Sequence, residues 1–163
     1  MKKLNVKIKK LAHFKGELPA YQSAGASGFD VRAQISETLT LQPGQRAMVP
    51  TGLSFEIPLG YEIQARPRSG MAVKQGLSVL NTPGTIDADY ADQIFISAWL
   101  RTPPGSEPIV ISPGDRIAQL VFLPIVRPTF SIVDRFSASS ARGLGGFGST
   151  GVTATQSAAS GSD

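Results

Sequence analysis

The chain has 163 residues, and 41% of them are hydrophobic, which suits a single domain with a buried core. It contains no cysteine, which excludes disulfides, thiolate nucleophiles and cysteine metal sites, and a cytoplasmic protein is the simplest interpretation. The net charge of +4 is compatible with nucleic acid or with a small polyanion as partner. No apolar run is long enough for a membrane span, and no signal peptide pattern is present.

The 17 glycines and 12 prolines are spread along the chain, which favours many short strands separated by turns. Alternating apolar and polar residues predict strands at 2–11, 29–33, 39–41, 47–49, 53–57, 61–65, 93–100, 109–111, 116–123 and 130–136. Pro43-Gly44 predicts a turn between the third and fourth of these strands. The lysines of the first strand are interpreted as a solvated outer face rather than a nucleic-acid patch. His13 is the single histidine, lies in a loop, and is assigned no role.

Residues 66–76 predict one short helix, with Ser69 as its N-cap and Gly76 at its C-terminal end. The free N–H groups of a helix start, together with a serine hydroxyl and an arginine, can bind an anion such as phosphate. An ordinary capped helix with a surface arginine is the alternative.

Residues 81–90 combine a Pro83-Gly84 turn, two aspartates and an exit tyrosine. Thr85 and Ile86 are predicted to form a short extended arm, Ala88-Asp89 a reversal, and residues 93–100 the return strand, so the segment is predicted to be a β-hairpin. Its open mouth could read the hydrogen-bonding edge of a flat heterocycle, and a carboxylate beside it could activate water. A surface hairpin whose aspartates only help the turn is the alternative.

Two further features have two readings each. Gln119 is a polar residue on an apolar strand, and it is either a satisfied core amide or a group that faces a ligand. Residues 142–151 are glycine-rich with one arginine and one phenylalanine, which suits either a mobile arm that orders on phosphates and a ring, or a disordered tail. Residues 152–163 are of low complexity and are expected to be disordered.

Five of these stretches, in this order and spacing, resemble the motifs of the trimeric deoxyuridine triphosphate nucleotidohydrolases, the dUTPases. The stretches are residues 27–31, 66–72, 84–90, 114–120 and 142–151. The likeness covers nearly the whole chain from Leu4 to Gly151. One position departs from the family pattern, because Asp92 stands where a glycine is usual, which affects the local turn and charge.

The resemblance implies an all-β, distorted jelly-roll barrel with one short helix, assembled as a homotrimer with sites between subunits. Residues 1–136 would form the jelly-roll domain, 137–151 an arm that closes a neighbouring subunit's site, and 152–163 a tail. The implied reaction is Mg²⁺-dependent hydrolysis of dUTP to dUMP and pyrophosphate, which keeps uracil out of DNA and supplies dUMP for thymidylate synthesis. No membrane or nucleic acid would be a partner.

By the same resemblance, Asp87 is the general base that activates water, and Asp30 holds Mg²⁺ through a water molecule. Substrate contacts are implied for Arg68, Ser69, Gly70, Asn81, Gly84, Thr85, Ile86, Tyr90, Phe95, Gln119, Arg142, Phe147, Gly148, Ser149 and Thr150. The alternatives are a dCTP deaminase-like enzyme of the same fold and a non-catalytic nucleotide-binding regulatory protein. A dCTP deaminase would need a different hairpin, without the Asp87 and Tyr90 pattern.

Overall fold

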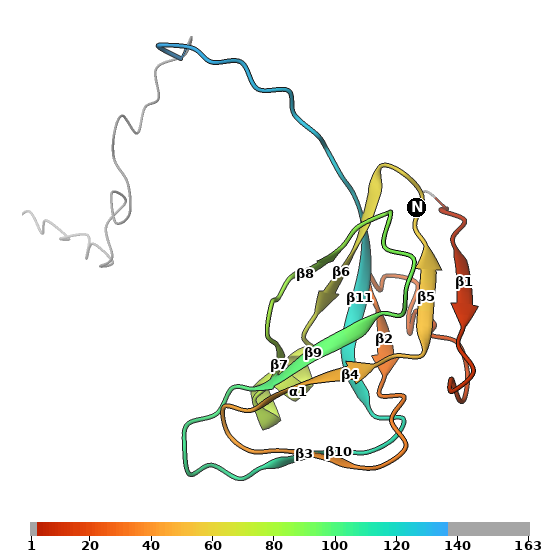
Figure 1. The fold of residues 1–163 in the computed structure, drawn as a ribbon, viewed down its shortest axis with the longest axis vertical. Coiled ribbons are helices and arrows are strands. Elements are labelled where there is room, and N and C mark those ends of the chain that lie inside the picture. Colours follow the sequence, from red (N-terminus) through yellow and green to blue (C-terminus); the bar gives the residue numbers. More distant parts are fainter. Residues whose placement is uncertain (1–2, 137–163) are drawn as a thin grey trace, which may run out of the picture. The chain divides into compact units, whose positions relative to one another are not determined.

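The structure is a computed structural model that describes residues 3–136. Within this range it contains eleven strands and one short helix, which confirms the predicted all-β architecture. The chain divides into two compact units, one ending at Arg127 and the other beginning at Pro128. All the strands and the helix belong to the first unit (Figure 1).

The strands of the first unit form four small antiparallel sheets. A four-stranded sheet has the order β2 (Phe29–Arg32), β11 (Arg116–Pro124), β6 (Tyr61–Arg66) and β8 (Gly84–Ile86). A three-stranded sheet has the order β4 (Arg46–Pro50), β9 (Phe95–Leu100) and β7 (Leu77–Val79). Two pairs complete the unit: β1 (Lys7–Lys10) with β5 (Leu53–Glu56), and β3 (Leu39–Leu41) with β10 (Ile109–Ile111).

Strands that follow each other in the sequence do not pair with each other anywhere in the described chain. The turn at Pro43-Gly44, for example, is present, but it leads from β3 in one sheet to β4 in another. Such repeated crossing between sheets is how jelly rolls are built, and it places residues distant in sequence side by side.

The core is formed by the inward faces of these sheets. Strand β9 shows the pattern that produces it, because Ile96, Ala98 and Leu100 are buried while the residues between them are more exposed. Phe29, Phe55 and Phe122 pack against one another with ring centroids 6.2–6.3 Å apart. Their contact joins β2, β5 and β11 into one body.

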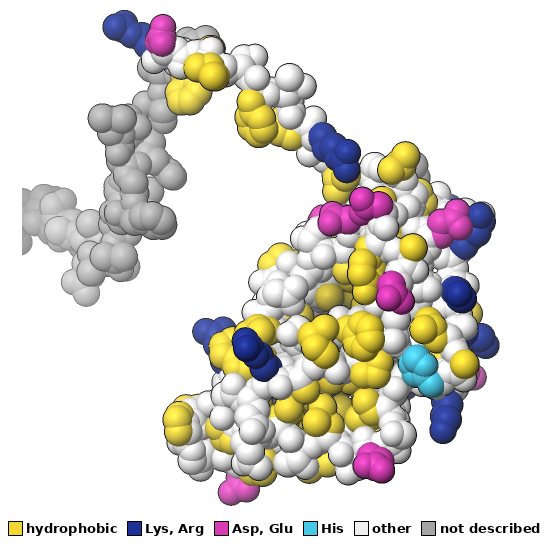
Figure 2. All heavy atoms as spheres, viewed as in Figure 1, with side chains coloured by type: hydrophobic (Ala, Val, Ile, Leu, Met, Phe, Trp, Pro, Cys, Tyr) yellow, Lys and Arg dark blue, Asp and Glu magenta, His cyan; other side chains and the backbone are white. Residues whose placement is uncertain are grey.

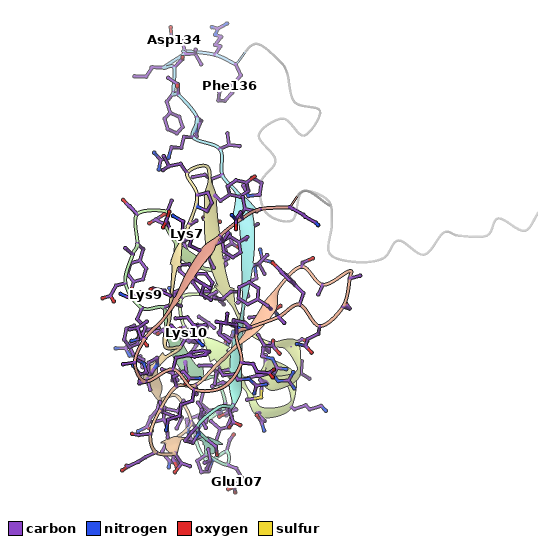
Figure 3. The ribbon with its side chains drawn as sticks, turned by 90° about the vertical axis from the view of Figure 1, so that its right-hand side faces the viewer. Lys7, Lys9, Lys10, Glu107, Asp134 and Phe136 are labelled. Atoms are coloured by element: carbon purple, nitrogen blue, oxygen red, sulfur yellow. The ribbon has the colours of Figure 1, made fainter. Side chains whose placement is uncertain are left out.

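Strand β1 carries the basic outer face that its alternation predicts. Figure 3 shows Lys7, Lys9 and Lys10 along this strand. Lys7 forms an ion pair of 3.0 Å with Glu56 on the neighbouring strand β5, and both side chains are largely exposed. Lysines on a strand at a sheet edge oppose edge-to-edge association, so a structural role explains them.

The single helix of the described residues is α1 (Ser69–Gln75), which lies against β7 (Figure 1). Gly76 ends it in the left-handed conformation, at φ 72°, as predicted. The prediction that Ser69 is the N-cap is wrong, since Arg68 occupies that position and Ser69 is the first helical residue. With seven residues, α1 is too short to cross a membrane, and no other helix is present in residues 3–136.

Two further predictions of secondary structure are wrong, and one strand was not predicted. Residues 84–100 form no hairpin, because β8 pairs with β6 whereas β9, which begins at Phe95, pairs with β4 and β7. Residues 130–136 form no strand, since the described part of the second unit supplies no ladder partner for their N–H and C=O groups. Strand β7 was not predicted, although Leu77 and Val79 are buried on either side of Ser78, because its partner β9 lies far along the chain.

The helix end provides a test of backbone strain. A methyl group at residue 76 would require a side chain at positive φ and would collide with Thr102 Cγ2. We expect Gly76→Ala to lower the free energy of unfolding by about 1–3 kcal/mol. Gly70→Ala is the matched control at the other end of α1, where a Cβ meets nothing within 4 Å, and it should change stability by less than about 1 kcal/mol. Chemical denaturation at one protein concentration measures the free energy of unfolding of both variants. Equal losses would contradict the assignment of backbone strain to position 76.

Candidate active site

A cavity of about 230 Å³ lies where the end of β8 faces β9. It is lined by Met48, Ala65, Val79, Asn81, Gly84, Thr85, Ile86, Asp87, Tyr90, Ile94, Phe95 and Ser97. Seven of these residues were predicted from the sequence. Pockets for drug-sized ligands measure about 300–1,000 Å³, so this cavity suits one portion of a larger molecule, such as a base with part of its sugar.

Strand β8 supplies backbone groups to this cavity. It is the last strand of the four-stranded sheet, with β6 as its only ladder neighbour among the described strands. Its other edge therefore presents N–H and C=O groups, which can pair with a planar ligand as they would with another strand. Thus the free backbone groups expected at a hairpin mouth are presented instead by a sheet edge.

Gly84 and Asn81 are packed closely in this wall. A Cβ at residue 84 would lie 3.1 Å from Asn81 Nδ2, so only glycine lets the Asn81 amide approach the strand without displacement. Both residues line the cavity. The pair gives the cavity a side-chain amide beside the backbone edge, which matches a heterocycle that carries both donors and acceptors.

The segment after β8 carries the carboxylate and the aromatic ring. Ala88 and Asp89 make the predicted reversal, and the Tyr90 N–H donates to the Asp87 carbonyl at 3.1 Å. Asp87 and Tyr90 both line the cavity, whereas Asp89 does not. The Asp87 residue is exposed, so its carboxylate can reach both solvent and a molecule in the cavity.

A second cluster of predicted residues is centred on Asp30 of β2. Its Oδ1 accepts a hydrogen bond of 2.9 Å from Arg68 Nε, and its Oδ2 accepts one of 3.3 Å from Arg116 Nη1. The Arg68 guanidinium also donates to the Arg116 carbonyl at 3.2 Å. One carboxylate between two guanidiniums leaves a net positive charge, which favours an anion such as phosphate.

Gln119 lies beside this cluster, opposite Asp30 in the β2–β11 register. Its amide donates to the Pro67 carbonyl at 2.9 Å, which holds the segment just before Arg68. A Cβ at Gly28 would come within 3.0 Å of Gln119 Oε1 and of the Leu120 carbonyl, so a glycine is required for this approach. The side-chain nitrogen of Gln119 therefore has a hydrogen-bond partner, and this contact places the side chain next to Arg68.

Ser69 and Gly70 follow Arg68 directly as the first two residues of α1, and both are exposed. The cavity lining contains none of the residues 68–70, nor Asp30 or Gln119. Within the described chain, the predicted residues thus form two groups, one at the cavity and one around Asp30. The five predicted residues of the arm, Arg142, Phe147, Gly148, Ser149 and Thr150, lie outside the described residues.

Several cavity residues were not predicted. Met48 and Ser97 face each other across the β4–β9 pair and both line the cavity. Met48, Tyr90 and Phe95 are also among the exposed large hydrophobic residues, and Figure 2 shows hydrophobic side chains gathered over β4 and β9, with Lys and Arg mostly near the edges of this face. A local sequence signal for Met48 is lacking, because its role depends on pairing with a strand far along the chain.

Comparison with solved structures identifies the class of protein. A mutant dUTPase of Staphylococcus bacteriophage 80alpha, solved with dUpNHpp, superposes with a TM-score of 0.76 at 27% identity, covering 91% of this chain and 99% of that chain. The chain is therefore a nearly all-β enzyme of the jelly-roll nucleotidohydrolase class, as predicted.

The family follows from sequence comparison. A family model of the dUTPases matches residues 15–151. The deoxyuridine 5'-triphosphate nucleotidohydrolase of Bdellovibrio bacteriovorus is 60% identical over 151 residues, which cover 93% of this chain and 99% of the relative. That of Chlamydia pneumoniae is 51% identical over 138 residues, which cover 85% of this chain and 93% of the relative. The chain belongs to the dUTPase family, which confirms the resemblance.

The Asp30 cluster can be tested by its energetics. The side chains of Asp30 and Arg68 are 20% and 25% exposed, whereas those of Lys7 and Glu56 are 69–78% exposed. A double-mutant cycle with Asp30→Ala and Arg68→Ala should give a coupling energy of about 1–2 kcal/mol in unfolding experiments. The matched cycle with Lys7→Ala and Glu56→Ala should give less than about 0.5 kcal/mol. Equal couplings would mean that Asp30 does not hold Arg68.

Proposed function

We propose that this chain hydrolyses dUTP to dUMP and pyrophosphate. Such an activity keeps uracil out of DNA and supplies dUMP for thymidylate synthesis. The observation that carries the proposal is the placement of Asp87 in one small cavity with the edge of β8, the Asn81 amide and the Tyr90 ring. An edge that can pair with a base, an aromatic wall and one carboxylate together support binding of a uracil base with activation of water beside it.

Asp87 acts as the general base. Its carboxylate accepts a proton from a water molecule as that water attacks the α-phosphorus in line, and pyrophosphate leaves on the opposite side. Its exposed position supports this role, because the attacking water must come from solvent. The positive cluster at Arg68, with Ser69 and Gly70 at the start of α1, binds phosphate oxygens, and Gln119 contacts the phosphate chain beside it.

Mg²⁺, when bound with the triphosphate, would supply positive charge to offset the charge that develops on the pyrophosphate, and Asp30 would hold it through a water molecule. The residues present fit an ion held mostly by phosphates and water. No group of three or more His, Asp or Glu side chains is gathered within residues 3–136. Each Asp30 oxygen accepts one N–H and retains a lone pair, so the carboxylate can contact an ion through water.

Three parts of the cavity select the substrate. The β8 edge and the Asn81 amide pair with uracil, and cytosine would leave buried donors and acceptors unpaired. A 5-methyl group would strike the backbone at this edge, which excludes thymine. Tyr90 packs on the deoxyribose and leaves no room for a 2′-hydroxyl, which excludes UTP, and Phe95 contacts the substrate beside it.

The complete site is formed between subunits of a homotrimer. Support comes from the two separate groups of residues in one chain, since neither contains both a base-reading edge and a phosphate cluster. A cyclic assembly brings the cavity of one subunit to the Arg68 cluster of another. The arm closes the site, with Arg142, Gly148, Ser149 and Thr150 on the outer phosphates and Phe147 stacked on uracil.

Replacement of the general base tests the reaction. We expect Asp87→Asn to lower kcat for dUTP by at least about 100-fold while leaving the affinity for dUMP near the wild-type value, because the amide keeps the shape but accepts no proton. Asp89→Asn is the matched control in the same turn, outside the cavity lining, and should keep most of the activity. Pyrophosphate release measured with dUTP, UTP, dCTP and dTTP gives the rates. An active Asp87→Asn enzyme would refute the mechanism, and wild-type preference for dCTP would refute the substrate.

Truncation tests the arm. Deletion of residues 141–163 should reduce kcat/KM for dUTP by at least about 100-fold, because the outer phosphates lose a cationic partner and the base loses a stacking ring. Deletion of residues 152–163 alone should leave the rate unchanged. Both proteins should remain trimers in light scattering. Full activity of the shorter protein would exclude a catalytic role for the arm.

A further inference from the structure

Gln93 is a buried polar residue, 8% exposed, just before β9. Its Oε1 accepts a hydrogen bond of 2.8 Å from the Gly52 N–H and lies 2.9 Å from His13 Nε2. An amide oxygen has two lone pairs, so the second contact is a hydrogen bond in which His13 Nε2 carries the proton. One side chain thus joins three segments that are far apart in the sequence.

The backbone of Gln93 is fixed from both sides. Its N–H donates to Asp92 Oδ1 at 2.6 Å, which gives a role to the aspartate that departs from the family pattern. The next residue, Ile94, donates its N–H to the Leu53 carbonyl at 2.8 Å and accepts the Thr51 hydroxyl at 2.7 Å. The Gln93 carbonyl is therefore held in one place.

That carbonyl accepts the hydrogen bond of the Tyr90 hydroxyl, at 2.7 Å. Tyr90 is 41% exposed and lines the cavity, so packing alone does not restrict its ring to one rotamer. The hydrogen bond to Gln93 is what fixes the far end of the ring. Any shift in the Gln93 backbone is consequently passed to one wall of the cavity.

His13 is seated by the same turn that Gln93 contacts. The Leu11 N–H donates to the Gly52 carbonyl at 2.9 Å, and the Phe14 N–H donates to the Leu11 carbonyl at 2.9 Å. Gly52 has φ 67°, and a Cβ there would come within 3.2 Å of Phe14. The N-terminal loop is thereby docked onto the turn, with the imidazole directed at Gln93.

We propose that Gln93 and His13 are positioning residues that set the selectivity of the cavity for a deoxyribose over a ribose, acting through Tyr90. The proposal rests on the proposed function, in which Tyr90 packs on the sugar. Neither residue lines the cavity, and Asp87 is not in contact with Gln93 through any hydrogen bond among those of residues 3–136. Loss of the network therefore changes sugar selection more than the chemical step.

The experiment compares kcat/KM for dUTP with that for UTP, and the affinities for dUMP and UMP by calorimetry. Gln93→Leu and His13→Phe should lower the dUTP-to-UTP ratio by about tenfold, the size expected for a lost buried hydrogen bond. Gln93→Glu keeps an acceptor oxygen and should restore most of the ratio. The matched control is Gln34→Leu, which removes two hydrogen bonds that anchor Lys15 of the same N-terminal loop, neither of which involves Gln93 or Tyr90.

A double-mutant comparison with Tyr90→Phe tests whether Gln93 acts through the Tyr90 hydroxyl. Tyr90→Phe removes the hydroxyl, so Gln93→Leu should add little to the loss of selectivity already caused by Tyr90→Phe. Additive losses, an unchanged ratio in folded Gln93→Leu, or an equal loss in Gln34→Leu would overturn the proposal. If Gln93→Leu does not fold, His13→Phe is combined with wild-type Tyr90 and with Tyr90→Phe, and the same comparison of selectivity losses tests the proposal. A wild-type protein without dUTP hydrolysis would instead refute the proposed function, which keeps the two failures distinct.

Discussion

The separation of β8 and β9 into different sheets is the constraint on which the candidate site depends. Because β8 pairs only with β6 among the described strands, one edge of its backbone remains available at the cavity. The same separation deprives residues 87–94 of the cross-strand support that a hairpin would give. Side-chain contacts replace that support: the Tyr90 hydroxyl on the Gln93 carbonyl, and the Gln93 amide on Gly52.

In the second group of site residues, ion pairs rather than backbone pairing fix the positions of the side chains. Asp30 is enclosed by Arg68 and Arg116, and it directs both guanidiniums without neutralising them fully. The Gln119 amide on the Pro67 carbonyl fixes the chain immediately before Arg68. These contacts order both guanidiniums in the free protein, which would reduce the ordering cost of binding an anion at the proposed phosphate site.

Features that depend on a few neighbouring residues could be predicted from the sequence. The turn at Pro43-Gly44 and the left-handed end of α1 at Gly76 are examples, because proline and glycine restrict or permit backbone angles locally. Strand partners could not be predicted in this way, since the partner of β8 is β6, which lies two strands earlier in the chain with α1 and β7 in between. For the same reason Met48 at the cavity and the contact between His13 and Gln93 were missed.

The contact between His13 and Gln93 joins residues 80 positions apart, and it lies beside a cavity wall. Entropy must be lost to close so long a loop before the contact returns any stabilisation, so topology of this kind slows folding. A chain emerging from the ribosome cannot complete the Tyr90 wall until residue 93 and the strand after it are available. The sheet that carries β8 is completed later still, because its inner strand β11 is the last strand of the described chain, so the candidate site takes shape only when the barrel itself closes.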